Sequence, residues 1–332
     1  MKAKKPKLSK NNQGYPVAVF IHRRISLLKQ QMSSLRKYRP PLVYLVADGP
    51  VSRDARQGRH CQRVRREYVK AIDWECKVVK IFSETKLGLA DRMVTGLDAI
   101  FAKEKFLIIL EDDCLPKKQF FEFVESAEKN FRKSSKIAGI SGSCFLPAKI
   151  APPHSYFFSK YAHCWGWATW ARWWNKYRKE ASPGAGRKYR DYFPQAPEDE
   201  SYYWDPILQK YWSREIQSWA YGWQEFFWRD GLLSVCPTEN LVENMGFGQG
   251  ATNTLDPDVQ TGAERNGRIK FPMKGPAEES EDIFLNRHVF QNHYVKMSGR
   301  KNLWQKILRK LQGGTWVRKI CRKTTPLVGR SP

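Results

Sequence analysis

Short apolar runs alternate with segments of helical periodicity along the first 140 residues. Apolar runs without internal alternation are typical of strands that are buried on both faces of a sheet. Between these runs, apolar residues recur at spacings of three and four, as in helices that cover a sheet. The pattern predicts strands at residues 17–21, 42–47, 76–82 and 106–110, and helices at residues 25–37, 58–72 and 89–102. This order favours an α/β fold with a mostly parallel sheet flanked by helices.

The fourth apolar run ends in three consecutive acids, Glu111, Asp112 and Asp113. They would lie at the carboxyl end of a central strand, where open α/β sheets bind their ligands. Adjacent carboxylates repel one another unless a cation lies among them, and hard divalent cations prefer carboxylate and phosphate oxygens. The stretch therefore predicts a site for a metal ion and a diphosphate. The alternative is a solvated acidic turn after a buried strand.

Polar residues also follow the first two predicted strands, Arg23 after the first and Asp48 after the second. An arginine can bind phosphate through two parallel hydrogen bonds, and an acid at a strand end can accept from a nucleobase or a ribose hydroxyl. The set suits a nucleotide. Taken singly, each residue is equally well explained as part of a turn.

The chain becomes rich in aromatic residues after residue 145. Trp167, Trp170 and Trp173 are spaced by three, which predicts three indoles along one helical face. Flat aromatic faces suit sugar rings, so Trp167 and Trp223 are candidate contacts for a saccharide acceptor. The alternative is that most of these side chains fill the core. Proline and glycine predict irregular connections at residues 142–159 and 181–200, and a last strand is predicted at 232–235.

Seven segments in a consistent order carry a family resemblance: VFIHRR, LVAD, LGLADRMVTGLDAIF, LIILEDDCLP, AGISG, CWGWATWARWW and NLVENMGFG. They resemble the GT-A glycosyltransferases related to N-acetylglucosaminyltransferase I, and more closely the bacterial family 2, or hemolytic-protein-like, sugar transferases. The resemblance covers roughly residues 15–255. It implies a GT-A (Rossmann-like) fold with a nucleotide-sugar-binding half at residues 14–145 and an aromatic-rich, acceptor-binding half at residues 146–295.

The resemblance also implies roles for particular residues. The nucleotide-sugar would be bound by Arg23, Asp48, Arg92, Glu111, Asp112 and Asp113. Asp113, the last acid of a Glu-Asp-Asp form of the DxD motif, would bind Mn²⁺ or Mg²⁺ directly. The implied activity is an inverting hexosyl or N-acetylhexosaminyl transfer in polysaccharide biosynthesis. The donor would be a nucleotide-diphosphate sugar, with a UDP-sugar favoured, and the acceptor a glycan or a lipid-linked saccharide.

Two positions depart from the family pattern. Relatives carry an Asp that acts as catalytic base where this chain has Ala220, and a His where it has Asn253. An alanine cannot accept a proton from an acceptor hydroxyl, so another acid substitutes or the chain is inactive. Glu225 and Asp205 are the nearest substitutes. A catalytically silent, sugar-binding relative of these enzymes is therefore the main alternative function.

The formal net charge of +25 is concentrated at the two ends of the chain. Five lysines fall in residues 1–10, and residues 296–332 hold eleven Lys or Arg without an acid. The sequence thus predicts a basic N-terminus at residues 1–13 and a basic tail at residues 296–332. Apolar residues at 304, 307, 308 and 311 make part of this tail an amphipathic helix suited to an anionic membrane surface. A helix packed on the catalytic domain is the alternative.

The same charge, interleaved with aromatic residues, would also fit a nucleic-acid-binding protein. We do not expect nucleic acid as a partner, because the basic residues lie at the ends and the acids would repel a phosphate backbone. Seven scattered cysteines without a CxxC pair indicate buried thiols in a reducing compartment. With no apolar leader or membrane span in the sequence, we expect a cytoplasmic protein at the inner face of the membrane.

Overall fold

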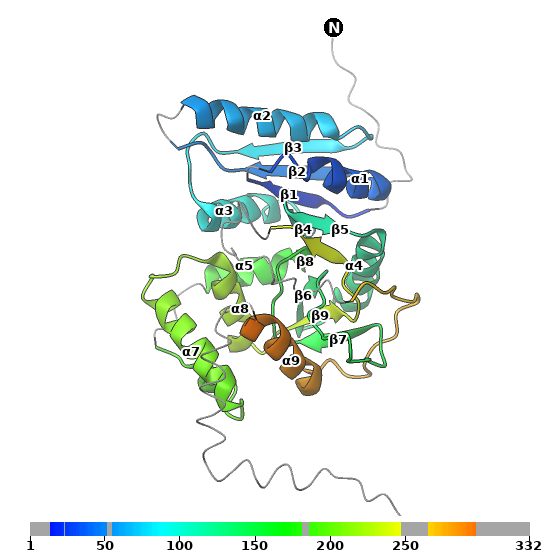
Figure 1. Ribbon diagram of the computed structural model, residues 1–332, viewed down its shortest axis with the longest axis vertical. Helices are drawn as coiled ribbons and strands as arrows, with labels where there is room; N and C mark the ends of the chain where they lie inside the picture. The colour runs from blue at the N-terminus through cyan, green and yellow to red at the C-terminus, as the bar shows by residue number, and fades with distance from the viewer. Residues whose placement is uncertain (1–13, 23, 52–54, 181–185, 247–264, 297–332) are drawn as a thin grey trace, which may run out of the picture.

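The computed structural model describes residues 14–22, 24–51, 55–180, 186–246 and 265–296. Its centre is a sheet with strand order β3-β2-β1-β4-β8-β6-β9-β7 (Figure 1). The strands of this sheet are β1 (Val17–Ile21), β2 (Leu42–Ala47), β3 (Lys77–Phe82), β4 (Phe106–Glu111), β6 (Ile137–Ser141), β7 (Tyr156–Ser159), β8 (Trp167–Trp170) and β9 (Leu233–Pro237). The four strands predicted before residue 111 are confirmed, and β9 confirms the last predicted strand.

The direction of the strands is mostly shared. β3, β2, β1 and β4 are parallel to their neighbours. β8 runs antiparallel to both β4 and β6, so β6 has the same direction as β4, and β9 is parallel to β6. β7 closes the sheet as an antiparallel edge strand. The predicted α/β fold with a mostly parallel sheet is therefore confirmed, and strands from both sides of residue 145 build it.

Helices cover both faces of the sheet (Figure 1). In one group, α1 (Leu28–Tyr38) contacts both α2 (Ala55–Ala71) and α4 (Lys118–Phe131). In a second group, α3 (Leu89–Phe101) contacts both α5 (Ala171–Lys179) and α8 (Trp219–Arg229). Their apolar stripes lie against fully buried strands, as the periodicity predicts. Tyr38 of α1 stacks on Phe121 of α4 at a centroid distance of 4.1 Å, which fixes those two helices to each other.

A second hydrophobic cluster lies beside α8 and contains several large aromatic side chains. Its helices are α6 (Tyr189–Tyr192), α7 (Glu198–Trp212), α9 (Ile283–Val289) and a π-helical segment, η1 (Phe290–Val295). Tyr161, Trp204 and Trp228 are almost completely buried there. The aromatic residues of the second half are thus divided between this cluster and the main core around the sheet, which contains Trp167, Trp223 and Phe226.

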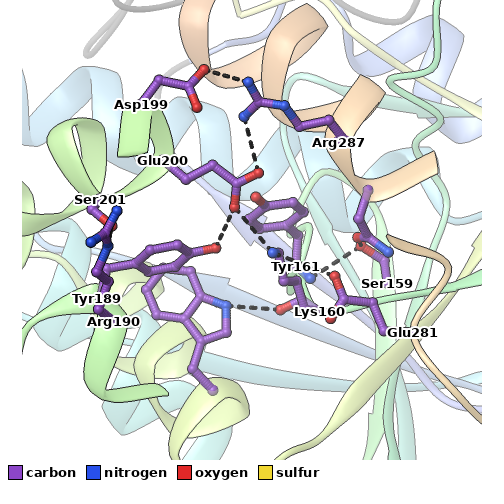
Figure 2. A network of polar contacts seen from close by, with 12 residues as sticks. Ser159, Lys160, Tyr161, Tyr189, Arg190, Asp199, Glu200, Ser201, Glu281 and Arg287 are labelled. Atoms are coloured by element: carbon purple, nitrogen blue, oxygen red, sulfur yellow. Dashed lines mark hydrogen bonds and ion pairs between the residues drawn. The ribbon is translucent and has the colours of Figure 1, made fainter. Parts of the chain in front are cut away.

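Ion pairs hold this second cluster together (Figure 2). Lys160 Nζ, directly after β7, lies 3.1 Å from Glu200 Oε2 and 3.4 Å from Glu281 Oε1. The Tyr189 hydroxyl donates to the same Glu200 oxygen at 2.8 Å. Arg287 of α9 pairs with Asp199 and Glu200. A buried ammonium thus links β7, α6, α7 and the segment before α9, and every charge in the group has an opposite partner.

The prediction that Trp167, Trp170 and Trp173 share a helical face is wrong. Trp167 and Trp170 are the two ends of strand β8, and only Trp173 lies in a helix, α5. β8 is held as a strand because it pairs with β4, with Trp167 opposite Ile109 and Trp170 opposite Phe106. Pairing with a long-range partner overrides the local spacing, which fits a helix equally well.

The predicted terminal segments, residues 1–13 and the tail after residue 296, lie outside the described residues. In the part of the chain that is described, no helix combines the length and the apolar character needed to cross a bilayer.

Candidate functional site

The candidate site lies at the carboxyl edge of three neighbouring strands. In the register of the sheet, Phe20 of β1 lies between Val46 of β2 and Glu111 of β4. Asp48 lies two residues after Val46 and Asp112 one residue after Glu111, so the fold brings these two predicted acids to the same edge of the sheet. The pattern of strands alone predicts this proximity, because the ends of parallel strands coincide.

Asp112 and Asp113 are both engaged by the segment that follows β1. Asp112 is 2% exposed, and its Oδ2 accepts from the backbone N–H groups of His22 at 2.8 Å and Arg24 at 3.2 Å. The Arg24 guanidinium lies 3.3 Å from Asp112 Oδ1 and also forms an ion pair with Asp113. Arg24 therefore supplies the positive charge that the three adjacent acids require.

Burial and mutual repulsion raise the pKa values of Glu111 and Asp113. Burial, followed by repulsion from Asp113 and Asp112, raises the pKa of Glu111 to about 8, although Arg24 opposes the shift. Burial also raises the pKa of Asp113, with Arg24 again opposing it. Burial lowers the pKa of Arg24, but Asp113 and Asp112 outweigh this effect and raise it. Added positive charge at this edge, from a cation or a charged ligand group, would lower the carboxyl pKa values and favour the ionised acids.

Asp48 accepts three hydrogen bonds from backbone N–H groups: Oδ1 from Gly49 and Leu87, both at 2.8 Å, and Oδ2 from Gly88 at 3.0 Å. These bonds tie the end of β2 to the turn that begins α3. The turn role that the sequence left open for Asp48 is thus observed. Two carboxylate oxygens offer about four acceptor sites, so a nucleotide could still donate to this side chain.

Arg92, in the second turn of α3, is 8% exposed. Burial lowers its pKa, while the charge of Asp48 acts in the opposite direction. Among the described residues, its Nε has no hydrogen-bond partner. A buried guanidinium N–H without an acceptor is costly unless a ligand supplies one. This unsatisfied donor fits the predicted role of Arg92 toward the diphosphate.

A cavity of about 260 Å³ opens beside Asp48. It lies between the ends of β1 and β2 and the first turns of α2, and four of the lining side chains can carry positive charge: His22, Arg56, His60 and Lys86. Asp48 lines it as well. The cavity combines an acid at a strand end with a cationic wall, a combination that suits the base and phosphates of a nucleotide.

The segment after the two-stranded sheet of β5 (Cys114–Pro116) and β10 (Val242–Asn244) packs against Asp113. The Met245 N–H donates to the Asp113 carbonyl at 2.9 Å. At Gly246, a Cβ atom would lie 2.3 Å from Asp113 Oδ2, so this close approach requires glycine. The glycine-rich stretch that begins here therefore starts in contact with the acid cluster.

A metal ion must be judged from the donor atoms. Within the described residues, no three His, Cys, Asp or Glu side chains gather into a cluster that could hold one. Mg²⁺ and Mn²⁺ at diphosphate sites commonly use one or two protein carboxylates and complete their shell with phosphate oxygens and water. Asp113, with a side chain 14% exposed, fits the first role. The residues are thus compatible with an ion that binds together with a nucleotide diphosphate.

Ala220, at the position of the expected base, and the two possible substitutes, Glu225 and Asp205, lie at different places in the fold. Ala220 lies in the first turn of α8. β9 follows α8 and is parallel to β4, so the N-terminus of α8 lies at the same sheet edge as the acids. Glu225 is five residues further along, about 7.5 Å by helical rise, and its Oε1 accepts from the Tyr192 hydroxyl at 2.9 Å. Asp205 accepts from the backbone N–H of Tyr189 at 2.7 Å and so anchors α6 to α7.

The two proposed acceptor-side tryptophans are core residues. Trp167 and Trp223 are 2% and 1% exposed, and their rings pack at a centroid distance of 5.8 Å. They present no surface to an acceptor, because the stacking of α8 on β8 covers them. Arg23 and Asn253 lie outside the described residues.

Sequence reasoning missed two residues that organise the site. Arg24 was read only as part of a motif, yet it pairs with both aspartates. The Gln31 side chain donates to the backbone carbonyls of Glu111 at 2.7 Å and Cys114 at 2.9 Å, and so attaches both ends of the segment that carries the acids to α1. A signal existed for Gln31, because this fully buried polar residue lies on the apolar stripe of α1 with Leu28, Met32 and Leu35.

Comparison with known proteins adds little to this geometry. No family model and no curated protein matches the sequence. HddC from Yersinia pseudotuberculosis, complexed with GMP-PN, aligns over 55% of this chain and 87% of its own, with 13% identity and a TM-score of 0.31. A UDP-glucose pyrophosphorylase complexed with UDP-glucose aligns over 52% and 82%, with 10% identity and a TM-score of 0.30. Values this low transfer no activity to the present chain.

Proposed function

We propose that this protein is a GT-A-type glycosyltransferase that moves a sugar from a nucleotide-diphosphate donor, with a UDP-sugar favoured, to a saccharide acceptor. The observation that carries the proposal is the convergence of Asp48, Arg92 and the Glu111–Asp113 acids on one sheet edge, beside a cavity with a cationic wall. An acceptor for a base or ribose, a donor for phosphate and a carboxylate for a cation are the three functions that a nucleotide-sugar site needs.

Each of these residues would have a separate role in binding the nucleotide-sugar. Asp48 accepts from the base or ribose, and Arg92 donates to the diphosphate from its buried position. Asp113 would hold Mn²⁺ or Mg²⁺, which when bound neutralises charge on the diphosphate leaving group. Arg24 sets the position of Asp112 and Asp113. The arrangement would raise the rate of transfer electrostatically, because preorganised charges at a sheet edge need no rearrangement when the sugar is transferred.

Nucleotide binding tests the proposal directly. A ligand that binds only the folded state stabilises it, by about 2.7 kcal/mol at a concentration one hundred times its Kd. We expect UDP and UDP-sugars with Mn²⁺ to raise the Tm, and an Arg92→Leu variant to lose most of the shift. Lys103→Leu, at the exposed end of α3, is the matched control. Equal shifts in Arg92→Leu and wild type, or none with any nucleoside diphosphate, would contradict the proposal.

A catalytically silent, sugar-binding protein is the second candidate function, and Ala220 favours it. The sheet edge at the first turn of α8 carries a methyl group where a proton acceptor would stand. Nucleotide-sugar transfer and hydrolysis, each measured with and without Mn²⁺, separate the two. Binding without turnover supports the silent protein, and Mn²⁺-dependent transfer supports the enzyme.

A further inference from the structure

A second cavity, of about 370 Å³, lies beside the first turn of α3. It is enclosed by α3, α5, α8 and the end of α7. α3 begins after β3 and α8 ends before β9, and both strands are parallel to β4. The first turns of α3 and α8 therefore lie at the sheet edge that carries the acids. Residues of both first turns line the cavity, which shares no lining residue with the first cavity.

The walls combine aromatic faces with charged groups. Tyr177, Tyr211 and Trp219 supply rings, and Glu225 and Arg229 lie one helical turn apart on the wall formed by α8. Gly222, on the same face of α8, leaves room for the rings. A Cβ atom there would lie 2.3 Å from the Tyr211 hydroxyl and 2.7 Å from that of Tyr177. The two phenols approach the helix only because this position carries no side chain.

Glu225 is the polar anchor of the cavity. It is 4% exposed, and one carboxylate oxygen accepts from the Tyr192 hydroxyl. The other oxygen, Oε2, lies 4.0 Å from Arg229 Nη1, beyond hydrogen-bonding distance. Arg229 is held by other partners, because its Nη2 lies 2.8 Å from Glu180 Oε2 and its Nε 2.9 Å from Asp230 Oδ1. The Glu225 carboxylate thus retains acceptor capacity toward the cavity.

We propose that this cavity binds a saccharide, with the Tyr177, Tyr211 and Trp219 rings against its C–H faces and the Glu225 carboxylate accepting from its hydroxyl groups. Rings with a few fixed polar groups are the usual lining of a small-ligand pocket, and a carboxylate can accept from two hydroxyls at once. The lining carries two acids, Asp91 and Glu225, and two arginines, Arg214 and Arg229, so it lacks the net positive charge that would attract the phosphates of a nucleotide. The identification of this saccharide as part of the acceptor rests on the proposed function. The prediction that the cavity binds a saccharide does not depend on that function.

Saccharide binding is tested with full-length protein and three disaccharides, cellobiose, lactose and N,N′-diacetylchitobiose, by saturation-transfer-difference NMR. We expect at least one to bind without nucleotide. We expect affinity to fall at least tenfold in Glu225→Gln, whose amide oxygen can still accept from Tyr192, and in Tyr211→Ala. Glu215→Gln and Tyr202→Ala, exposed residues outside the cavity, are matched controls and should bind as wild type does. Circular dichroism verifies that each variant is folded.

The outcomes separate this proposal from the proposed function. Absence of binding by all three disaccharides, or unchanged binding in both cavity variants, would overturn the saccharide site. UDP binding with Mn²⁺, measured on the same samples, should be unaffected by Glu225→Gln and Tyr211→Ala. Loss of UDP binding in these variants would also count against two separate sites. Saccharide binding without any nucleotide binding would support the saccharide site and contradict only the proposed glycosyltransferase function.

Discussion

The Arg24 guanidinium forms an ion pair with the Asp113 carboxylate at the carboxyl edge of β4, and the side chain of Arg24 is only 21% exposed. A protein cation thus occupies the surroundings of the carboxylate that is proposed to bind a metal ion. Any cation that binds Asp113 must compete with Arg24 or share the carboxylate with it. The charge balance of the site therefore couples metal binding to the position of the segment after β1.

The first prediction concerns Asp113. We expect Asp113→Ala to abolish Mn²⁺-dependent binding of UDP or UDP-sugar and to leave the fold intact, because its carboxylate is the proposed metal ligand. Isothermal titration with UDP, with and without Mn²⁺, measures the effect. Asp73→Ala, which removes an exposed acid paired with Arg36, is the control. Unchanged Mn²⁺-dependent affinity in Asp113→Ala would refute the assignment.

Ala220 gives a second prediction. If the base has been lost, Ala220→Asp should raise the rate of transfer by about 10²- to 10⁴-fold, the usual contribution of a positioned general base. The first turn of α8 lies at the correct sheet edge for this role. Initial rates at saturating donor and acceptor measure it. If Ala220→Asp brings no gain while Glu225→Gln removes turnover, the base does not belong at position 220.

Two buried histidines predict a loss of stability in acid. Burial lowers the pKa of His163 to about 3, and burial together with His163 lowers that of His293 well below its ordinary value. Both stay neutral in the folded protein, whereas in the unfolded chain each takes up a proton below about pH 6.5. Stability is therefore full above that pH and falls as the pH drops, by up to about 1.4 kcal/mol per pH unit for each histidine.

The histidine prediction is checked by urea unfolding between pH 7.5 and pH 4.5. His293 stacks on Phe145 at a centroid distance of 3.8 Å, so His293→Phe keeps an aromatic ring there and should flatten the pH dependence. His154→Phe, at a partly exposed position, should leave the slope nearly unchanged. The same steepness in His293→Phe and wild type would show that other groups cause the acid sensitivity.

The ion pairs of Lys160 predict that loss of this one charge strongly lowers the free energy of unfolding. Lys160→Met leaves the buried Glu200 with only Arg287 as a cationic partner and removes the ammonium partner of the half-buried Glu281, and breaking a buried pair costs about 3–5 kcal/mol. Chemical denaturation measures the change in the free energy of unfolding. The exposed pair of Lys118 and Glu122 is the control, since Lys118→Met should cost less than about 0.5 kcal/mol. Similar costs at both positions would contradict the role of the network in Figure 2.

The basic tail, outside the described residues, remains a prediction from sequence. Eleven Lys or Arg follow residue 295, and each contributes about 1 kcal/mol of attraction near an anionic bilayer. We expect full-length protein to co-sediment with vesicles rich in phosphatidylserine at low salt, and a chain truncated after Ser298 to remain in the supernatant. Vesicles of phosphatidylcholine alone are the control. Equal sedimentation of the two proteins would refute membrane attachment through the tail.

The sequence by itself determined the first half of the sheet and the location of the site. Apolar runs such as residues 106–110 fit a fully buried strand, and the acids that follow them had to emerge at the carboxyl edge. The ends of parallel strands coincide, so the proximity of Asp48 to the Glu111–Asp113 cluster followed from strand order. These features depend on local periodicity and on a general rule of topology, both of which one sequence contains.

Only the tertiary structure decided what pairs with what. Spacing placed Trp167 and Trp170 on a helix, whereas pairing with β4 makes them the ends of a strand and buries Trp167 under α8. Nothing local shows that Arg24 is the partner of Asp113, or that Gly222 admits the phenols of Tyr177 and Tyr211. Such contacts join residues between 11 and 89 positions apart, and their energies depend on burial and geometry that arise only when the sheet and its helices come together.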